Sequence, residues 1–180
     1  MNGLRRSEIC GLRWCDVDFT QNQVYICHTA VPRGGKTLYD DHTKTPTSTR
    51  LLPLNDTVRA ILLTERERQE KYTAMMGCAY QGSGYVCVWE DGHAIQPNYI
   101  THMFGKILKQ AQKHGSTLPL YRFHDLRHTA ASLMLRNHVD LKTIQEWLGH
   151  SSMDVTAKIY LHSNMESKKI AATAMETLLA

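Results

Sequence analysis

Residues 122–151 read RFHDLRHTAASLMLRNHVDLKTIQEWLGHS, and this stretch predicts two short helices joined by a tight turn. The first should cover about 123–137, because apolar residues recur along it at helical spacing: Leu126, Ala130, Leu133 and Met134. The second should begin after Asp140, a favourable N-cap residue, and end at Gly149, since glycine commonly stops a helix. The stretch therefore predicts a helical C-terminal part.

The rest of the chain predicts further helices and a few strands. A long helix is expected at about 56–75, capped by Asn55, and another at about 97–114, which starts at a proline. Shorter helices are expected near the two ends, at 4–14 and 164–180. Three segments favour strands: 23–31, 48–54 and 85–89. The predicted fold class is mainly α with a small antiparallel β-sheet (α+β).

Composition limits the class of protein. The chain has 180 residues, of which 42% are hydrophobic, as expected for one globular domain. No apolar run approaches the roughly 20 residues of a membrane span, and the N-terminus lacks a signal-peptide core, so a cytoplasmic protein without membrane contact is expected. The five cysteines form no C-x-x-C pair, which argues against a disulfide framework and a cysteine zinc site. We interpret them as buried or incidental thiols.

Positive charge gathers in one part of the sequence. The net charge is only +4, yet residues 96–136 contain one acid, Asp125, and six basic residues: Lys106, Lys109, Lys113, Arg122, Arg127 and Arg136. Such an excess attracts nucleic-acid phosphates, although a solvated basic helix face is an equally ordinary explanation.

Three local patterns carry groups that can act on a phosphate ester. His124 and Arg127 are three residues apart, so both should project from one helical face, turned away from the apolar stripe. His150 follows the helix stop and precedes a helix start, where anions bind. Tyr160 comes ten residues later, and a stabilised phenolate is a nucleophile. Taken singly, each pattern is also explained by a surface ion pair, a capping loop or a packing tyrosine.

Their order along the chain resembles the tyrosine recombinase (phage integrase) family. The matching motifs are Gly3-Leu4-Arg5-Arg6-Ser7-Glu8, Thr43-Lys44-Thr45 before a strand, H-x-x-R at 124–127, L-G-H at 148–150 and I-Y-L-H at 159–162. The resemblance covers essentially the whole chain and extends to integrases of phages and conjugative transposons. It implies the tyrosine recombinase catalytic-domain fold and a site-specific recombinase that acts on double-stranded DNA.

The resemblance also implies roles for individual residues. Arg5 and Arg127 would bind the non-bridging oxygens of the scissile phosphate, where fixed positive charge stabilises the transition state. His150 would hydrogen-bond the phosphate. Tyr160 would attack phosphorus and form a 3′-phosphotyrosine. Glu8, three residues after Arg5, matches an acid that supports the site.

Two further residues would handle protons. Lys44 would protonate the departing 5′ oxygen from a β-hairpin, and His124 would assist proton transfer involving the tyrosine. Because the ester link preserves the energy of the broken bond, we expect no cofactor and no metal. A zinc site at His124 and His128 is disfavoured, since H-E-x-x-H is not matched and Arg127 between them would repel a cation.

The resemblance departs from the family in its N-terminal extent. Family members usually carry further helices and a core-binding domain before the first arginine, which is residue 5 here. We therefore expect residues 1–180 to be a single catalytic domain from a longer integrase, truncated at its N-terminus. Residues 164–180 resemble a helix that docks on a neighbouring protomer, with intramolecular packing as the alternative. Two other functions remain open: a type IB topoisomerase-like enzyme and a non-catalytic DNA-binding or assembly module.

Overall fold

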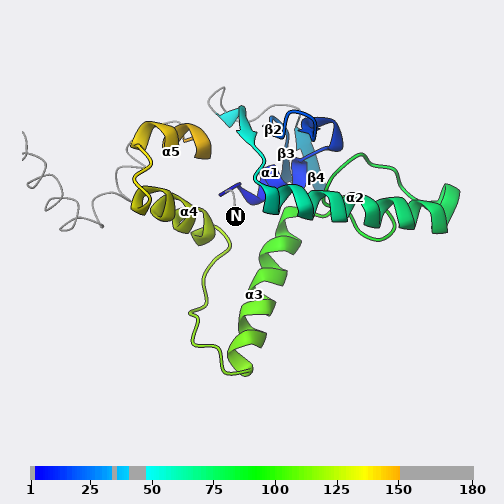
Figure 1. The fold of residues 1–180 in the computed structure, drawn as a ribbon. Helices are drawn as coiled ribbons and strands as arrows, with labels where there is room; N and C mark the ends of the chain where they lie inside the picture. The colour runs from blue at the N-terminus through cyan, green and yellow to red at the C-terminus, as the bar shows by residue number, and fades with distance from the viewer. Residues whose placement is uncertain (1–2, 34–35, 41–47, 151–180) are drawn as a thin grey trace, which may run out of the picture.

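A computed structural model describes residues 3–33, 36–40 and 48–150 of the chain (Figure 1). Lys44, Tyr160 and the helix expected at 164–180 lie outside these residues. The elements in chain order are α1 (Arg6–Gly11), η1 (Trp14–Asp16), β1 (Val17–Asp18), β2 (Gln23–Ile26), β3 (Thr29–Arg33), β4 (Lys36–Asp40), β5 (Arg50–Pro53), α2 (Asp56–Met76), η3 (Gly77–Ala79), α3 (Pro97–Lys113), α4 (Asp125–Arg136) and α5 (Leu141–Leu148). The mainly helical class with small antiparallel sheets is confirmed.

The strands form two antiparallel groups. In the first, β2 lies between β1 and β5, and Val24 is opposite Leu52. In the second, β3 and β4 form a hairpin. The single strand predicted at 23–31 was wrong, because the chain leaves the first sheet at Cys27 and His28, whose side chains contact Asp16. β3 then pairs only with β4 among the described strands.

Two apolar clusters stabilise this arrangement. One joins α2 to the sheet and contains Leu12, Val24, Ile26, Leu52, Leu54, Leu62 and Val86. The other lies between α4 and α5 and contains Ala131, Ile144 and Leu148. Trp147 packs against both clusters, so it connects the sheet to the C-terminal helices.

Most predicted helices are confirmed with their capping residues. Asn55 accepts a hydrogen bond from Val58 N at the start of α2, and Asp140 accepts one from Thr143 N at the start of α5. Gly149 ends α5 with a left-handed φ of 65°, a conformation that favours glycine.

Two predictions about side chains and strands were wrong. Leu133 is exposed, whereas Ala130 and Ala131 are buried on the same side of α4 as Arg127. The basic residue therefore lies on the buried face of α4, because its guanidinium finds carbonyl acceptors there. Within the described residues, the strand expected at 85–89 is reduced to isolated bridges at Tyr85 and Val88.

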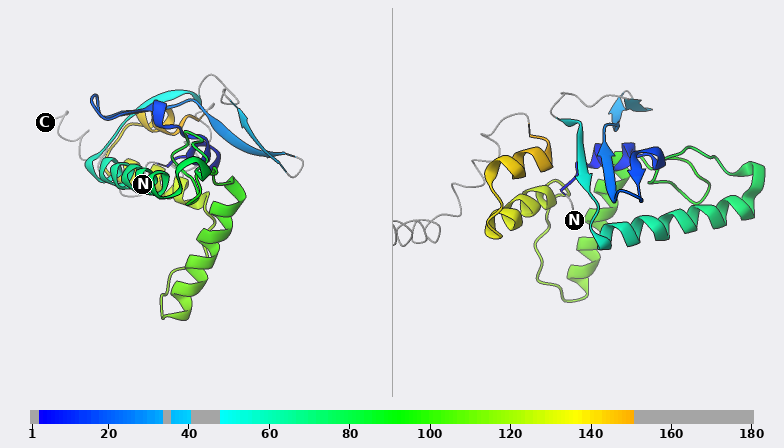
Figure 2. Two further views of the ribbon diagram at one scale, coloured as in Figure 1. Left: turned by 90° about the vertical axis from the view of Figure 1, so that its right-hand side faces the viewer. Right: turned by 45° about the horizontal axis from the view of Figure 1, so that its top comes forward.

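The views agree on the arrangement of the larger elements. Helices α4 and α5 lie together on one side of the molecule, and α2 extends toward the other side along the sheet (Figures 1 and 2). The β3–β4 hairpin projects away from the helices (Figure 2). In the described part of the chain, no helix combines the length and the apolar character needed to cross a membrane.

Candidate active site

Arg5 links the two ends of the described chain. It is the N-cap residue of α1, and its backbone N–H donates to Glu8 Oε2 over 2.9 Å. Its Nη1 donates to Glu8 Oε1 over 2.6 Å, while its Nη2 donates to the carbonyl oxygen of Gly149 over 2.8 Å. The guanidinium is thereby held at the junction between α1 and the end of α5.

Arg127 is held by backbone carbonyls from both sides of the same junction. Its side chain is buried, its Nη1 donates to Gly3 O over 2.7 Å, and its Nη2 donates to Leu148 O. Its Nε donates to Nε2 of His150 over 3.3 Å, so that ring nitrogen is an acceptor and the imidazole is neutral in this contact. Arg127 therefore brings Gly3, Leu148 and His150 to one place.

Gly3 allows this close approach. Its φ is +66°, and a Cβ added to it would lie 2.6 Å from Cδ2 of Leu148. Both the backbone conformation and the packing therefore require glycine at this position.

Arg50 is a site residue that the sequence analysis missed. It is buried on β5, where it faces inward with Leu52, and its Nη1 and Nη2 donate to the two oxygens of Glu8 over 3.2 and 3.1 Å. Its Nε donates to Trp147 O over 2.6 Å. The available signal was a charged residue at an inward position of an alternating strand, which requires a buried partner.

We name Arg5, Glu8, Arg50, Arg127 and His150 the arginine cluster. In the described part of the chain it contains three guanidinium groups and one carboxylate: Arg5 and Arg50 bind Glu8, and Arg127 donates to His150. Burial alone would raise the pKa of Glu8, but the hydrogen bonds and charges of Arg50 and Arg5 outweigh it, so that pKa is lowered. The carboxylate is therefore ionised, and the cluster retains an excess of positive charge.

The same excess lowers the pKa values of the bases near it. Burial and the neighbouring Arg5 lower the pKa of Arg127 to about 9. Burial, Arg127 and Arg5 lower the pKa of His150 to about 4. For His124 the pKa is lowered by burial, then by His128 and Arg127. Both pKa values lie below the ordinary value for histidine, first because burial disfavours the charged imidazole and then because the neighbouring cations oppose its protonation.

A pocket opens beside the cluster. It has a volume of about 410 Å³ and is lined by Leu4, Arg5, Arg6, Ser7, Thr101, Arg122, Phe123 and His124. Arg6 donates to Thr101 over 2.9 Å, and Arg122 pairs with Asp125 over 2.9 Å. The pocket therefore offers guanidinium, hydroxyl and imidazole groups to a solute, a donor set suited to an anion.

The structure brings five of the predicted residues together: Arg5, Glu8, His124, Arg127 and His150. Arg5 and Arg127 are close enough for their charges to affect the two histidines. His124 is the N-cap residue of α4, and its ring centroid is 5.1 Å from that of His128. Lys44 and Tyr160 belong to the residues not described, so their predicted roles stay predictions.

The arrangement can bind an anion through fixed donors. In the described contacts, one N–H of each Nη atom of Arg5 and Arg127 is engaged. Because each Nη carries two hydrogens, each keeps a second N–H. A phosphate oxygen that contacts both side chains would face donors already oriented by the backbone. A separate group that could hold a metal, Asp16, Cys27 and His28, lies outside this cluster.

Comparisons with known proteins identify the family of the chain. The model of the phage integrase family matches residues 1–167, and the chain belongs to that family. The chain is 32% identical, over 98% of its length, to a tyrosine recombinase XerC-like protein of Caldanaerobacter subterraneus subsp. tengcongensis. It is 26% identical, over 99% of its length, to the ICEBs1 integrase of Bacillus subtilis. It covers 46% and 47% of those two proteins, respectively, so it spans about half the length of the curated relatives it matches.

Solved structures show the same fold. The Tn1549 transposon integrase, determined in complex with transposon right end DNA, superimposes with a TM-score of 0.80 at 26% identity. This similarity covers 99% of the present chain and 56% of that integrase chain. XerA recombinase shares the fold with a TM-score of 0.68 at 22% identity, over 97% of this chain and 54% of that one.

Proposed function

We propose that this chain carries the catalytic residues of a site-specific DNA recombinase of the integrase type, which breaks and rejoins strands through a 3′-phosphotyrosine. One observation supports this above the others: Arg5 and Arg127, from distant parts of the sequence, donate to the adjacent residues Gly149 and His150. Membership of the phage integrase family supports the same chemistry. Because the chain spans about half the length of its curated relatives, the activity is proposed only for the part of the protein that this sequence covers.

The proposed reaction assigns one task to each side chain. Arg5 and Arg127 bind the non-bridging oxygens and stabilise the negative charge that develops at phosphorus. Tyr160 attacks phosphorus, Lys44 protonates the departing 5′ oxygen, and His124 assists proton transfer at the tyrosine. Glu8 holds Arg5 and Arg50 in place.

His150 would change its protonation state when phosphate binds. In the described structure Nε2 accepts from Arg127, so it cannot also donate to an oxygen. A bound phosphate offsets the surrounding positive charge and raises the pKa of the ring. The imidazole can then take up a proton and donate to the phosphate.

The proposed partners follow from this chemistry. Double-stranded DNA is the substrate, and self-association on DNA is expected because strand exchange joins two duplexes; a neighbouring copy would receive residues 164–180. The relatives include an integrative-element integrase and a transposon integrase, which favours a mobile genetic element as the source and strand exchange over topoisomerase-like relaxation. We place the activity in the cytoplasm, where a bacterial DNA substrate is reached.

A nicked suicide DNA substrate tests the proposal. The chain should form a protein–DNA adduct that resists denaturant, and Tyr160→Phe should abolish it while the matched exposed variant Tyr25→Phe retains it. Chelator should leave the adduct intact. An adduct of normal yield in Tyr160→Phe would reassign the nucleophile, and DNA binding without any adduct in the parent chain would favour an assembly module.

A further inference from the structure

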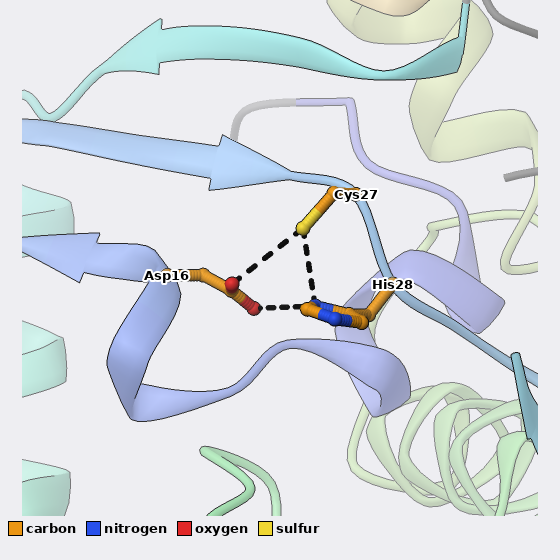
Figure 3. A group of neighbouring side chains, drawn as sticks. All are labelled: Asp16, Cys27 and His28. Atoms are coloured by element: carbon orange, nitrogen blue, oxygen red, sulfur yellow. Dashed lines mark hydrogen bonds and ion pairs between the residues drawn. The ribbon is translucent and has the colours of Figure 1, made fainter. Parts of the chain in front are cut away.

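Three potential metal ligands converge at the junction between the two sheets (Figure 3). Asp16 ends η1, whereas Cys27 and His28 occupy the two positions between β2 and β3. Nδ1 of His28 lies 2.9 Å from Oδ2 of Asp16 and 3.1 Å from Sγ of Cys27. Sγ of Cys27 lies 3.5 Å from the other carboxylate oxygen, Oδ1 of Asp16, so the three side chains form a small triangle through four atoms. We name these residues the Asp–Cys–His cluster.

The backbone fixes these positions without a metal. The N–H of Arg13 donates to Oδ2 of Asp16 over 3.1 Å. On the other side, a Cβ added to Gly11 would lie 2.7 Å from Cα of Thr29 and 2.8 Å from the carbonyl carbon of His28. Helix α1 therefore packs directly on the segment that carries the two ligands, and the side chains are partly buried.

The triangle does not have the geometry of a nucleophilic triad. In such a triad the imidazole uses one ring nitrogen for the thiol and the other for the carboxylate. Here both contacts are made to Nδ1, so the ring cannot relay a proton between them.

Protons can satisfy the triangle in one arrangement, through long sulfur contacts. If Nδ1 is protonated, it donates to Oδ2 of Asp16, and the thiol donates over 3.5 Å to Oδ1 of Asp16 or over 4.0 Å to the carbonyl oxygen of Tyr25. If Nδ1 is unprotonated, it receives the thiol proton, but its lone pair then faces a carboxylate oxygen at 2.9 Å. A cation between the three atoms would contact all three lone pairs at once.

We propose that Asp16, Cys27 and His28 form a binding site for a divalent transition metal, with Zn²⁺ as the preferred ion. Carboxylate, thiolate and imidazole are the ligands that zinc takes in proteins, with bonds of about 2.0–2.3 Å. A tetrahedral ion with such bonds holds its ligand atoms roughly 3.3–3.7 Å apart. The observed distances are 2.9 and 3.5 Å, to Oδ2 and Oδ1 of Asp16 respectively, and 3.1 Å between Nδ1 of His28 and Sγ of Cys27. One ligand atom from each residue lies within 4.8 Å of the others, so small side-chain shifts bring them to that spacing.

Cys15 is the candidate for a fourth ligand. Sγ of Cys15, an exposed thiol, lies 3.9 Å from Oδ1 of Asp16. Binding replaces the S–H bond of Cys27 by a metal–sulfur bond, and the proton passes to solvent. The absence of C-x-x-C spacing argued against a cysteine zinc site. The fold nevertheless brings together ligands from η1 and from the β2–β3 junction, which match no local sequence motif.

Cobalt titration of the full 180-residue chain tests this proposal, because Co²⁺ is a spectroscopic substitute for Zn²⁺. One equivalent should produce a thiolate-to-cobalt charge-transfer band and visible bands of tetrahedral intensity, and Zn²⁺ should displace them. The Cys27→Ser chain should lose the charge-transfer band and weaken binding by about tenfold or more. The matched control Cys78→Ser, which changes an exposed thiol remote from the cluster, should retain both.

Each outcome decides the proposal. The proposal is overturned if the parent chain gives no charge-transfer band. It is also overturned if the band survives in a folded Cys27→Ser chain. If Cys27→Ser fails to fold by circular dichroism, Asp16→Asn provides the second variant, and undiminished cobalt affinity there overturns it. A band in Cys15→Ser equal to that of the parent supports three protein ligands plus water, whereas a reduced band supports four.

Discussion

The arginine cluster and the Asp–Cys–His cluster are both partly buried groups of polar side chains packed around α1, yet they select opposite charges. In the first, Arg5 and Arg50 share the carboxylate of Glu8, and the third guanidinium, that of Arg127, donates to the neutral His150. In the second, a carboxylate, a thiol and an imidazole, which are all possible metal ligands, contact one another through shared protons. The first has donors in excess and suits an anion, whereas the second has acceptors in excess and suits a cation.

The comparison teaches that residue type alone does not decide what a buried histidine does. His150 is surrounded by cations, which keep it neutral until an anion arrives. His28 directs a nitrogen toward a carboxylate and a sulfur atom, so a cation can replace the shared protons. The two clusters should therefore respond differently to substitution and to pH.

Glu8→Gln should destabilise the fold by about 3–5 kcal/mol, because it leaves the buried guanidinium of Arg50 and the partly exposed one of Arg5 without their counter-charge. The free energy of unfolding in urea measures the loss. Asp16→Asn should cost clearly less, since its partners Cys27 and His28 can both be neutral. The exposed pair residue Glu70 supplies the control, as Glu70→Gln should change stability little. Equal losses of stability for Glu8→Gln and Asp16→Asn would contradict the proposed difference between the two clusters.

Arg127→Ala and Arg5→Ala should each slow DNA cleavage by about 10²–10³-fold, by analogy with the loss of one oxyanion donor. Single-turnover cleavage of the suicide substrate measures the rate, on chains whose circular dichroism is native. Arg66→Ala, at an exposed position of α2, is the matched control, and Cys27→Ser should also cleave at nearly the parent rate. Cleavage at the parent rate by Arg127→Ala would remove its proposed role.

Acid should destabilise the protein through His150. Its pKa is about 6.5 in the unfolded chain and about 4 in the fold, so only the unfolded chain takes up the proton between these values. Stability is therefore full above pH 6.5 and falls as the pH decreases toward 4. The loss is at most a few kcal/mol, since each pKa unit corresponds to about 1.4 kcal/mol.

Unfolding free energies measured across this pH range give the slope. His150→Asn should flatten it, whereas His102→Asn, at an exposed position of α3, should leave it unchanged. A slope that is the same in His150→Asn and the parent chain would show that other groups account for the acid sensitivity.

The sequence predicted the parts of the fold that depend on local signals. The caps Asn55 and Asp140 and the stop at Gly149 act within one turn of chain, and the helices they bound are confirmed. The meeting of Arg5, Arg127 and His150 was predicted from a family resemblance, because no local pattern joins residues so far apart.

Other features depend on tertiary contacts that no local pattern reveals. The strand predicted across Cys27 and His28 is interrupted, because those side chains find Asp16. Arg127 was expected to face away from the apolar stripe, but carbonyl groups of Gly3 and Leu148 make its burial favourable. Arg50 was missed because its partner Glu8 lies on a different element.

The carbonyl groups that orient Arg5 and Arg127 come from two turns with left-handed glycines, Gly3 and Gly149. Main-chain oxygens are present whatever side chain a position carries, so surface substitutions can accumulate around this site without misdirecting its guanidinium groups. The two glycines are the positions at which this arrangement is most sensitive to substitution. A single methyl group at Gly3 would collide with Leu148 and would change the orientation of Arg127, more than a hundred positions away. No ionisable group would have been altered.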